Sequence, residues 1–141
     1  MKGIGKPLVL LAEDTPAAVV LVERALRKAN FQCDLRVVGD GREALLYLNG
    51  EDLYSDRERH PLPALLITNV RMPRLSGFEL LGWVRRHPQL KTLPVVVISS
   101  SDIDADSSQA YALGASSYLV KPISSEMMAE VLRSLDLLDA V

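Results

Sequence analysis

The chain of 141 residues has a single cysteine, and its charges nearly balance. One cysteine, Cys33, excludes an intramolecular disulfide framework and any metal site built from several cysteines. Sixteen basic and eighteen acidic residues are interspersed along the chain, so no basic stripe of the kind that nucleic-acid binding needs is present. We therefore expect no direct nucleic-acid partner.

Long hydrophobic runs are also missing. No stretch of eighteen apolar residues occurs, and the apolar run near the start is too short for a signal peptide. We therefore expect a cytoplasmic protein with no membrane partner. The length suits one domain, which we place at residues 7–138 between an N-terminal extension, 1–6, and a C-terminal tail, 139–141.

What the sequence does contain is a set of short, continuous apolar runs. They are rich in β-branched residues and do not alternate with polar ones, which is typical of parallel strands buried on both faces. The runs occupy residues 8–12, 35–38, 64–68, 95–99 and 117–120.

The segments between these runs have helical spacing. Thr15 followed by Pro16 suits a helix start, and Gly114 suits a left-handed helix end. We predict helices at 16–29, 41–49, 77–87, 105–113 and 124–138. Five repeats of strand and then helix predict an α/β fold, a doubly wound five-stranded parallel sheet with helices on both faces.

Polar side chains follow four of the five predicted strands. Glu13 and Asp14 come after the first, Asn69 after the third, Ser99 ends the fourth and Lys121 follows the fifth. Sheets of this kind place their sites at the carboxyl ends of the strands. Two carboxylates suit Mg²⁺, a hydroxyl can donate to a phosphoryl oxygen, and an ammonium can neutralise one. The pattern predicts a phosphoryl-transfer site whose acceptor would stand where Asn69 stands.

Five segments in order carry a resemblance to a known family: "LLAEDTP", "VVGDGREAL", "NVRMPRLSGFELL", "LPVVVISSSD" and "ALGASSYLVKP". Over residues 7–138 the chain resembles the receiver domain of two-component response regulators, which has a (βα)5 flavodoxin-like fold. The loop "GEDLYSDRERHPLPA" and the stretch "LLAEDTPAAVVLVERAL" are similar to those of the small single-domain regulators that serve phytochrome-type histidine kinases.

The resemblance implies roles for the site residues. Glu13, Asp14 and the backbone carbonyl of Arg71 would be metal ligands. Ser99 would be the switch hydroxyl, Tyr118 the aromatic whose rotamer follows it, and Lys121 the phosphate partner, joined to the next proline by a cis bond. Other interpretations remain open: Glu13 and Asp14 could cap the first helix, Lys121 could be an internal ion-pair partner, and Ser99 and Tyr118 could be ordinary strand residues.

The chain departs from the family at Asn69, where the family has the aspartate that accepts a phosphoryl group from a kinase histidine. An amide has no anionic oxygen with which to attack, so standard phosphotransfer should fail. The substitution also removes a negative charge, so we expect Mg²⁺ binding to be possible but weakened, with no other cofactor.

The leading hypothesis is a stand-alone, atypical receiver that is not an enzyme and that signals by docking to a sensor histidine kinase or another signalling protein. A homodimer is possible through the face of the fourth helix, fifth strand and fifth helix. One alternative is a conventional regulator that carries an engineered Asp-to-Asn change. A more distant alternative is a flavodoxin-like ligand binder or a phosphatase.

Overall fold

The structure is a computed structural model that describes residues 6–139. Strands and helices alternate along this part of the chain: β1 (Leu8–Ala12), α1 (Pro16–Lys28), β2 (Asp34–Val38), α2 (Gly41–Asn49), the short 3-10 turn η1 (Asp52–Tyr54), β3 (Leu65–Asn69), α3 (Gly77–Arg86), β4 (Val95–Ser99), α4 (Asp104–Ala112), β5 (Ser117–Val120) and α5 (Ser125–Ser134). No helix in residues 6–139 is both long and apolar enough to cross a membrane.

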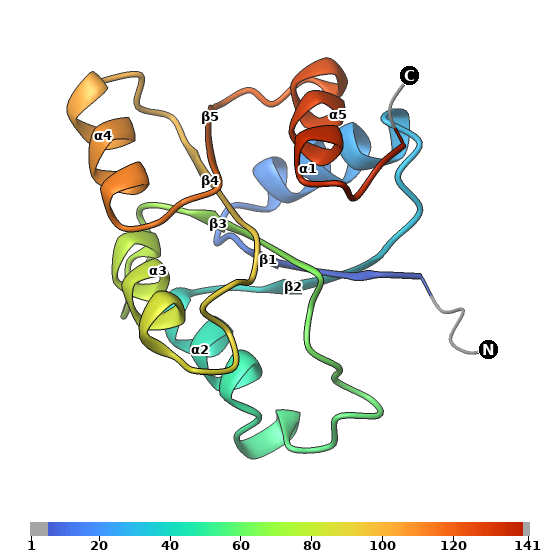
Figure 1. Cartoon of the computed structure of the whole chain (residues 1–141), viewed down its shortest axis with the longest axis vertical. Helices are drawn as coiled ribbons and strands as arrows, with labels where there is room; N and C mark the ends of the chain where they lie inside the picture. Colours follow the sequence, from blue (N-terminus) through green and yellow to red (C-terminus); the bar gives the residue numbers. More distant parts are fainter. Residues whose placement is uncertain (1–5, 140–141) are drawn as a thin grey trace.

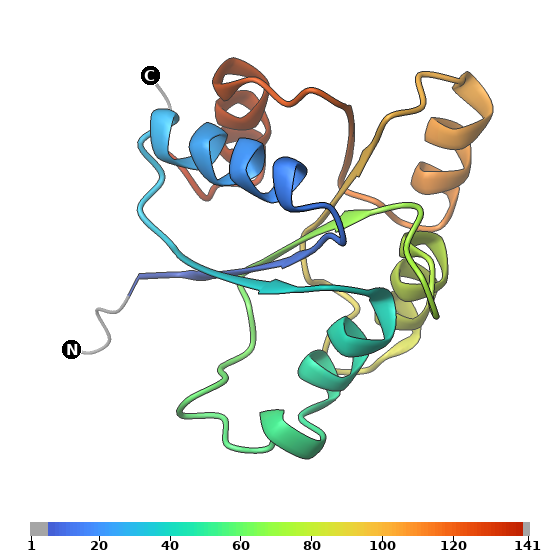
Figure 2. The same cartoon turned by 180° about the vertical axis from the view of Figure 1, so that it is seen from behind.

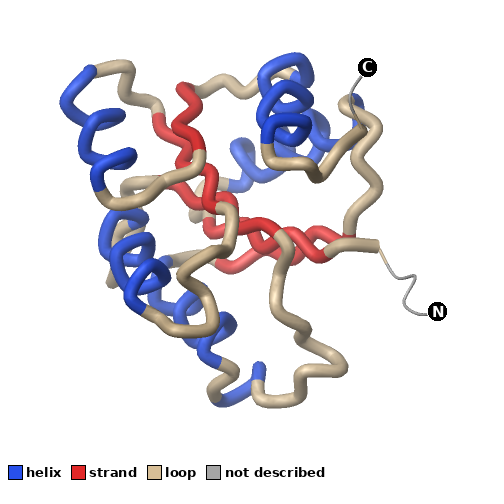
Figure 3. Tube along the Cα trace, in the orientation of Figure 1, coloured by secondary structure: helices blue, strands red, loops and turns tan. Residues whose placement is uncertain are grey.

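The five strands form one parallel sheet in the order β2-β1-β3-β4-β5 (Figures 1 and 3). This arrangement confirms the predicted doubly wound sheet. The chain passes from β1 outward to β2 and then returns to β3 on the other side of β1, so the strand order reverses between β1 and β3. The central strands β1, β3 and β4 are buried along their whole length, which explains why their sequences are continuously apolar.

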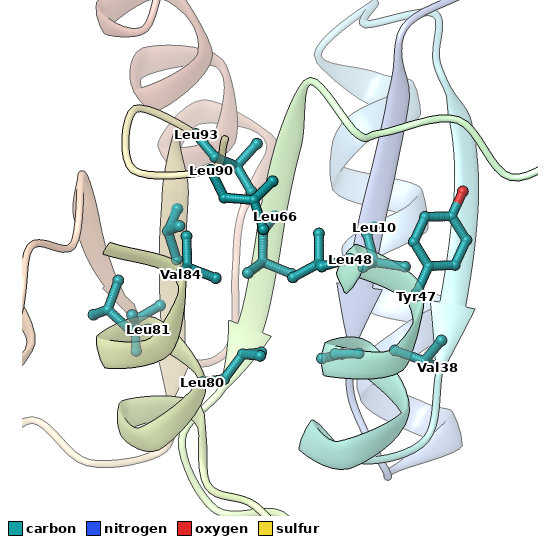
Figure 4. Packing of buried hydrophobic residues seen from close by; sticks show 14 of the residues in the cluster. Leu10, Val38, Tyr47, Leu48, Leu66, Leu80, Leu81, Val84, Leu90 and Leu93 are labelled. Atoms are coloured by element: carbon teal, nitrogen blue, oxygen red, sulfur yellow. The ribbon is translucent and has the colours of Figure 1, made fainter. Parts of the chain in front are cut away.

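Helices cover both faces of the sheet. The helices α2, α3 and α4 pack on one face around Leu10, Leu66 and Val97, as Figure 4 shows for α2 and α3. On the opposite face α1 and α5 lie side by side over Val9 and Ile67 (Figure 2). Because successive strand residues point to opposite faces, each buried strand contributes to both hydrophobic clusters.

The element boundaries agree with the predictions to within a residue or two except at the last helix. The predicted end at residue 138 is wrong, since α5 ends at Ser134. Asp136 adopts a left-handed conformation with φ of 60°, and the Leu137 N–H donates to the Leu132 carbonyl at 2.9 Å. This closing turn brings Leu137 back against the core, where burial favours it over another exposed helical turn.

Two other expectations concern the chain ends and the first helix. The predicted extension 1–6 and tail 139–141 lie outside the described residues, apart from Lys6 and Asp139. Thr15 is the residue before α1, as predicted, but its side chain makes no capping hydrogen bond. The Thr15 N–H instead donates to a carboxylate oxygen of Glu13 at 3.1 Å.

The long segment between α2 and β3 is tied to α2 by side chains of its own, Arg57 and Tyr54. The Arg57 guanidinium donates to the carbonyls of Tyr47 and Leu48, at the end of α2. The Tyr54 ring lies 4.9 Å from the Tyr47 ring between centroids, and the Tyr54 hydroxyl donates to Glu43 at 2.9 Å. Burial, followed by this bond to Glu43, raises the pKa of Tyr54 to about 12.

This raised pKa predicts a loss of stability at alkaline pH. The unfolded chain releases the Tyr54 proton near pH 10, whereas the folded protein holds it to about 12, so the free energy of unfolding falls as pH rises between these values. Tyr54→Phe should make that fall shallower in urea unfolding followed between pH 9 and pH 12. Equal slopes for Tyr54→Phe and the wild-type protein would contradict the prediction.

Candidate functional site

The carboxyl ends of β1, β3, β4 and β5 meet at one edge of the sheet, beside the point where the strand order reverses. Parallel pairing aligns Ala12 with Thr68, and Asn69 with Ile98. The residues that follow β1 therefore lie next to Asn69, the last residue of β3. Lys121 reaches the same edge from the end of β5, where its N–H donates to the Ser99 carbonyl at 2.7 Å.

Glu13 is the buried acid at the centre of this edge. Its side chain is fully buried, and one carboxylate oxygen, Oε1, accepts from the Lys121 ammonium at 2.8 Å. The other oxygen, Oε2, accepts from the Thr15 N–H at 3.1 Å and from the Asn69 amide at 3.3 Å. A buried carboxylate requires such partners, and here both of its oxygens have them.

The Asn69 side chain is buried, and its amide nitrogen, Nδ2, faces three oxygen atoms. It lies 3.0 Å from the Arg71 carbonyl, 3.3 Å from Glu13 Oε2 and 3.5 Å from Asp14 Oδ1. All three are acceptors without a proton to give, since one is a carbonyl and the others belong to carboxylates. The opposite orientation would point the amide oxygen at three other oxygens, so the hydrogen-bond network determines which way the carboxamide faces.

The backbone of Asn69 is held tightly from two sides. The Thr68 hydroxyl, which is fully buried, donates to the Asn69 carbonyl oxygen at 3.0 Å. Gly77, the first residue of α3, packs so closely that a Cβ placed there would lie 2.1 Å from the same oxygen. The Gly77 N–H also donates to the Val70 carbonyl at 2.8 Å. These contacts leave little freedom to the residue that ends β3.

A second hydrogen-bond network centres on Ser101, in the loop between β4 and α4. The Ser101 N–H donates to the Ser99 hydroxyl at 3.0 Å, and the Ser101 carbonyl accepts from the Tyr118 hydroxyl at 2.8 Å. The Ser101 hydroxyl donates to Asp106, on α4, at 2.6 Å. The loop is thereby tied to β4, β5 and α4 together.

The predicted site residues thus fall into two groups. The structure brings together Glu13, Asp14, Asn69, Arg71 and Lys121 in one network, while Ser99 and Tyr118 belong to the network around Ser101. The Lys121–Pro122 bond is cis, as the family resemblance implied. The role of Ser101 was not predicted from the sequence. The signal was a run of three serines, 99–101, at the end of β4, and it does not indicate which serine joins the loop to the neighbouring elements.

Two carboxylates and one carbonyl converge at the acidic edge, and all three face the Asn69 amide. Within residues 6–139 no cluster of three or more histidine, cysteine, aspartate or glutamate side chains is placed to hold a metal ion. Two carboxylates, Glu13 and Asp14, and the Arg71 carbonyl are the oxygen ligands that the resemblance implied, and each of the three faces the Asn69 amide nitrogen. Mg²⁺ needs about six oxygen ligands near 2.1 Å, in an octahedron.

The sequence is similar to those of known proteins of one family. The model of the response regulator receiver domain matches residues 9–133. A probable methanogenesis regulatory protein, FilR2, of Methanothrix harundinacea is 35% identical over 119 residues, which cover 84% of this chain and 74% of FilR2. Response regulator Rcp1 of a Synechocystis species is 32% identical over 114 residues, covering 81% of this chain and 76% of Rcp1.

Solved structures agree with these relatives. The bacteriophytochrome response regulator RtBRR is 33% identical, with a TM-score of 0.84, and the match covers 96% of this chain and 81% of RtBRR. The Mn²⁺-bound form of Rcp1 has a TM-score of 0.79 at 28% identity, covering 96% of this chain and 97% of Rcp1. The chain therefore belongs to the response regulator receiver domain family of two-component signalling proteins and is related to its phytochrome-associated regulators.

Proposed function

We propose that this receiver acts in two-component signalling by docking to partner proteins, without a phosphoryl group on residue 69. The observation that carries the proposal is the carboxamide of Asn69 at the end of β3, which faces the acidic pair on the opposite side of Glu13 from Lys121. An amide oxygen is neutral and its lone pair is delocalised, so it is no nucleophile toward phosphorus. Asn69 therefore stands at the phosphoacceptor position without the chemistry of an acceptor.

The same substitution weakens the binding of a divalent cation. Glu13 and Asp14 with Lys121 carry a formal charge of −1, where a third carboxylate would make −2. Rcp1 is known in a Mn²⁺-bound form, and a cation bound here would use Glu13, Asp14 and the Arg71 carbonyl. Its chemical contribution would be to offset negative charge at the edge of the sheet. Thr68, a buried hydroxyl where aliphatic residues are usual in receivers, supports a natural divergence of this site.

The docking surface that we propose is the face formed by α4, β5 and α5. The Ser101 network ties the loop after β4 to two elements of this face, α4 and β5. Ile103 and Tyr111, which are 62% and 51% exposed, provide apolar contact area there. The Tyr111 hydroxyl also accepts the N–H of Tyr118 at 3.1 Å, which protects an edge strand from unspecific pairing. A sensor histidine kinase, another signalling protein or a second copy of the chain would bind this face.

The chemistry is tested by incubating the protein with acetyl phosphate and Mg²⁺ and measuring the intact mass. We expect no added phosphoryl group on the wild-type protein, because residue 69 is an amide. Asn69→Asp should become phosphorylated, since the other residues of the edge are in place. Asn49→Asp, which adds the same charge at an exposed helix end, is the matched control and should stay unmodified.

Two results would change the proposal. An adduct on wild-type residue 69 or 68 would overturn it. If Asn69→Asp becomes phosphorylated and then changes its binding to a partner, the remaining machinery is that of a conventional regulator. That result would favour the alternative in which Asn69 is an engineered change from aspartate in a conventional regulator.

A further inference from the structure

We infer that the Asn69 carboxamide is a built-in replacement for the divalent cation and closes the acidic edge to Mg²⁺. The inference rests on the proposed function only in taking residue 69 as the former acceptor position. It goes beyond the loss of one negative charge, because it assigns a positive role to the amide nitrogen: the N–H groups of Asn69 take the acceptor oxygens that a cation would take.

The geometry of the amide supports this role. Nδ2 lies within 3.0 to 3.5 Å of Glu13 Oε2, Asp14 Oδ1 and the Arg71 carbonyl, which come from the loops after β1 and after β3. A single partly positive NH₂ group thus joins the two segments that a metal ion would join. The amide N–H groups lie between the three oxygen atoms and donate to them, which offsets the electrostatic repulsion between these oxygens.

The remaining ligand capacity of the edge is also in use. Glu13 Oε1 accepts from the Lys121 ammonium at 2.8 Å, and Oε2 also accepts from the Thr15 N–H. An incoming cation would have to displace the amide from Glu13 while giving up some of its own tightly held water. In return it would gain two carboxylates, of which one is already paired with a lysine.

The position of the amide is constrained. Asn69 is 9% exposed, and its backbone is held by the Thr68 hydroxyl and by the close approach of Gly77. The backbone that carries the carboxamide is therefore fixed at the edge. Rotation of the carboxamide about its last torsion would turn the amide oxygen toward a cation, and the NMR signals of the side-chain NH₂ would detect that rotation.

Substitution by alanine separates this inference from a simple effect of charge. Asn69→Ala removes the amide and leaves the formal charge of the edge unchanged. If only charge limits Mg²⁺ binding, the alanine variant should bind Mg²⁺ no better than the wild-type protein. If the amide replaces the cation, the variant should bind Mg²⁺ better, although it has gained no ligand.

The experiment is a Mg²⁺ titration of the thermal unfolding midpoint for the wild-type protein, Asn69→Ala, Asn69→Asp and the control Asn49→Asp. We expect the wild type and the control to shift by less than about 1 °C at about 10 mM Mg²⁺. Asn69→Asp should rise by about 4 to 6 °C once Mg²⁺ exceeds its Kd about tenfold. Asn69→Ala should fall between them, starting from a lower midpoint without Mg²⁺ because two carboxylates have lost a donor.

The side-chain NH₂ signals of Asn69 in an amide NMR spectrum, identified by their loss in Asn69→Asp, give a second measurement that does not depend on the folding of Asn69→Ala. They should not move when Mg²⁺ is added to the wild-type protein. Two results would show that the carboxamide turns and admits the cation. One is a wild-type thermal midpoint that rises with Mg²⁺ as much as that of Asn69→Asp. The other is a change in the NH₂ chemical shifts that increases with the Mg²⁺ concentration and then levels off. Equal Mg²⁺ responses of Asn69→Ala and the wild type would leave charge as the cause and overturn the inference.

These outcomes are separate from those of the phosphorylation test. A wild-type protein that binds Mg²⁺ but accepts no phosphoryl group contradicts the inference and leaves the proposed function standing. A wild-type protein that gains a phosphoryl group on residue 69 contradicts the proposed function, whatever its response to Mg²⁺.

Discussion

Replacing Gly77 with alanine is expected to lower the free energy of unfolding by about 3 kcal/mol, although alanine is the better helix former. The new Cβ would lie 2.1 Å from the carbonyl oxygen of Asn69 and 3.1 Å from the Cα of Val70. Both neighbours are backbone atoms, so the clash cannot be relieved by turning a side chain. Either α3 or the end of β3 must move, and urea unfolding should show a midpoint well below that of the wild type.

Gly82 provides the matched control in the same helix. A Cβ at Gly82 meets only the tip of the Arg86 side chain, at 3.2 Å, which is flexible and can move away. Gly82→Ala should therefore be neutral or stabilising by up to about 1 kcal/mol, from the smaller loss of backbone entropy on folding. Similar changes for the two alanine variants would contradict the close packing of α3 against Asn69.

Lys121→Met is expected to destabilise the protein by about 3 kcal/mol, which would lower the thermal midpoint by about 10 °C. The Glu13 side chain is fully buried, and the Lys121 ammonium 2.8 Å away is its cationic partner. Removing one member of a buried ion pair leaves an uncompensated charge in a poorly solvated place. Glu13 keeps its hydrogen bonds from Thr15 and Asn69, which places the loss at the lower end of the usual range.

The charge on Glu13 can be removed to test this cause. In the double variant Glu13→Gln with Lys121→Met, neither member of the pair carries a charge. Much of the lost stability should therefore return. Lys91→Met removes an exposed lysine, and it should change the free energy of unfolding by no more than about 0.5 kcal/mol. A loss for Lys121→Met as small as that of Lys91→Met would show that the pair contributes little to stability.

A structural ion pair also bears on the proposed function. Under the proposed function Lys121 has no phosphoryl group to bind, yet its ammonium still joins the end of β5 to the residue after β1. This contact, together with the Ser101 network, keeps the α4–β5–α5 face attached to the acidic edge. We propose that the surface offered to partners is therefore set by the fold itself.

Much of the fold follows from local pattern. The apolar runs of β1 and β4 have the predicted bounds because a strand buried on both faces must be continuously apolar. The end of α5 could not be predicted in the same way. Leu135, Leu137 and Leu138 continue the helical apolar pattern, but the left-handed Asp136 and the packing of Leu137 on the core end the helix early.

The candidate site was predicted only in part. The topology of alternating strands and helices was enough to expect Glu13, Asp14, Asn69 and Lys121 at one edge of the sheet. Their pairing was not predictable, because it depends on distances between segments that are far apart in the chain. Ser101 shows the same limit, since its hydrogen bonds join two strands and a helix whose relative position the sequence does not state.

The sequence by itself determined the class of fold, most bounds of the strands and helices, and an amide at the position where the family resemblance implies an acid. Those properties depend on residue type and spacing, which are local. Only the tertiary structure decided which oxygens the Asn69 amide faces, which carboxylate Lys121 neutralises, and how closely Gly77 approaches the end of β3. Hydrogen bonds and steric contacts act over a few ångströms, so they exist only after folding has brought distant segments together.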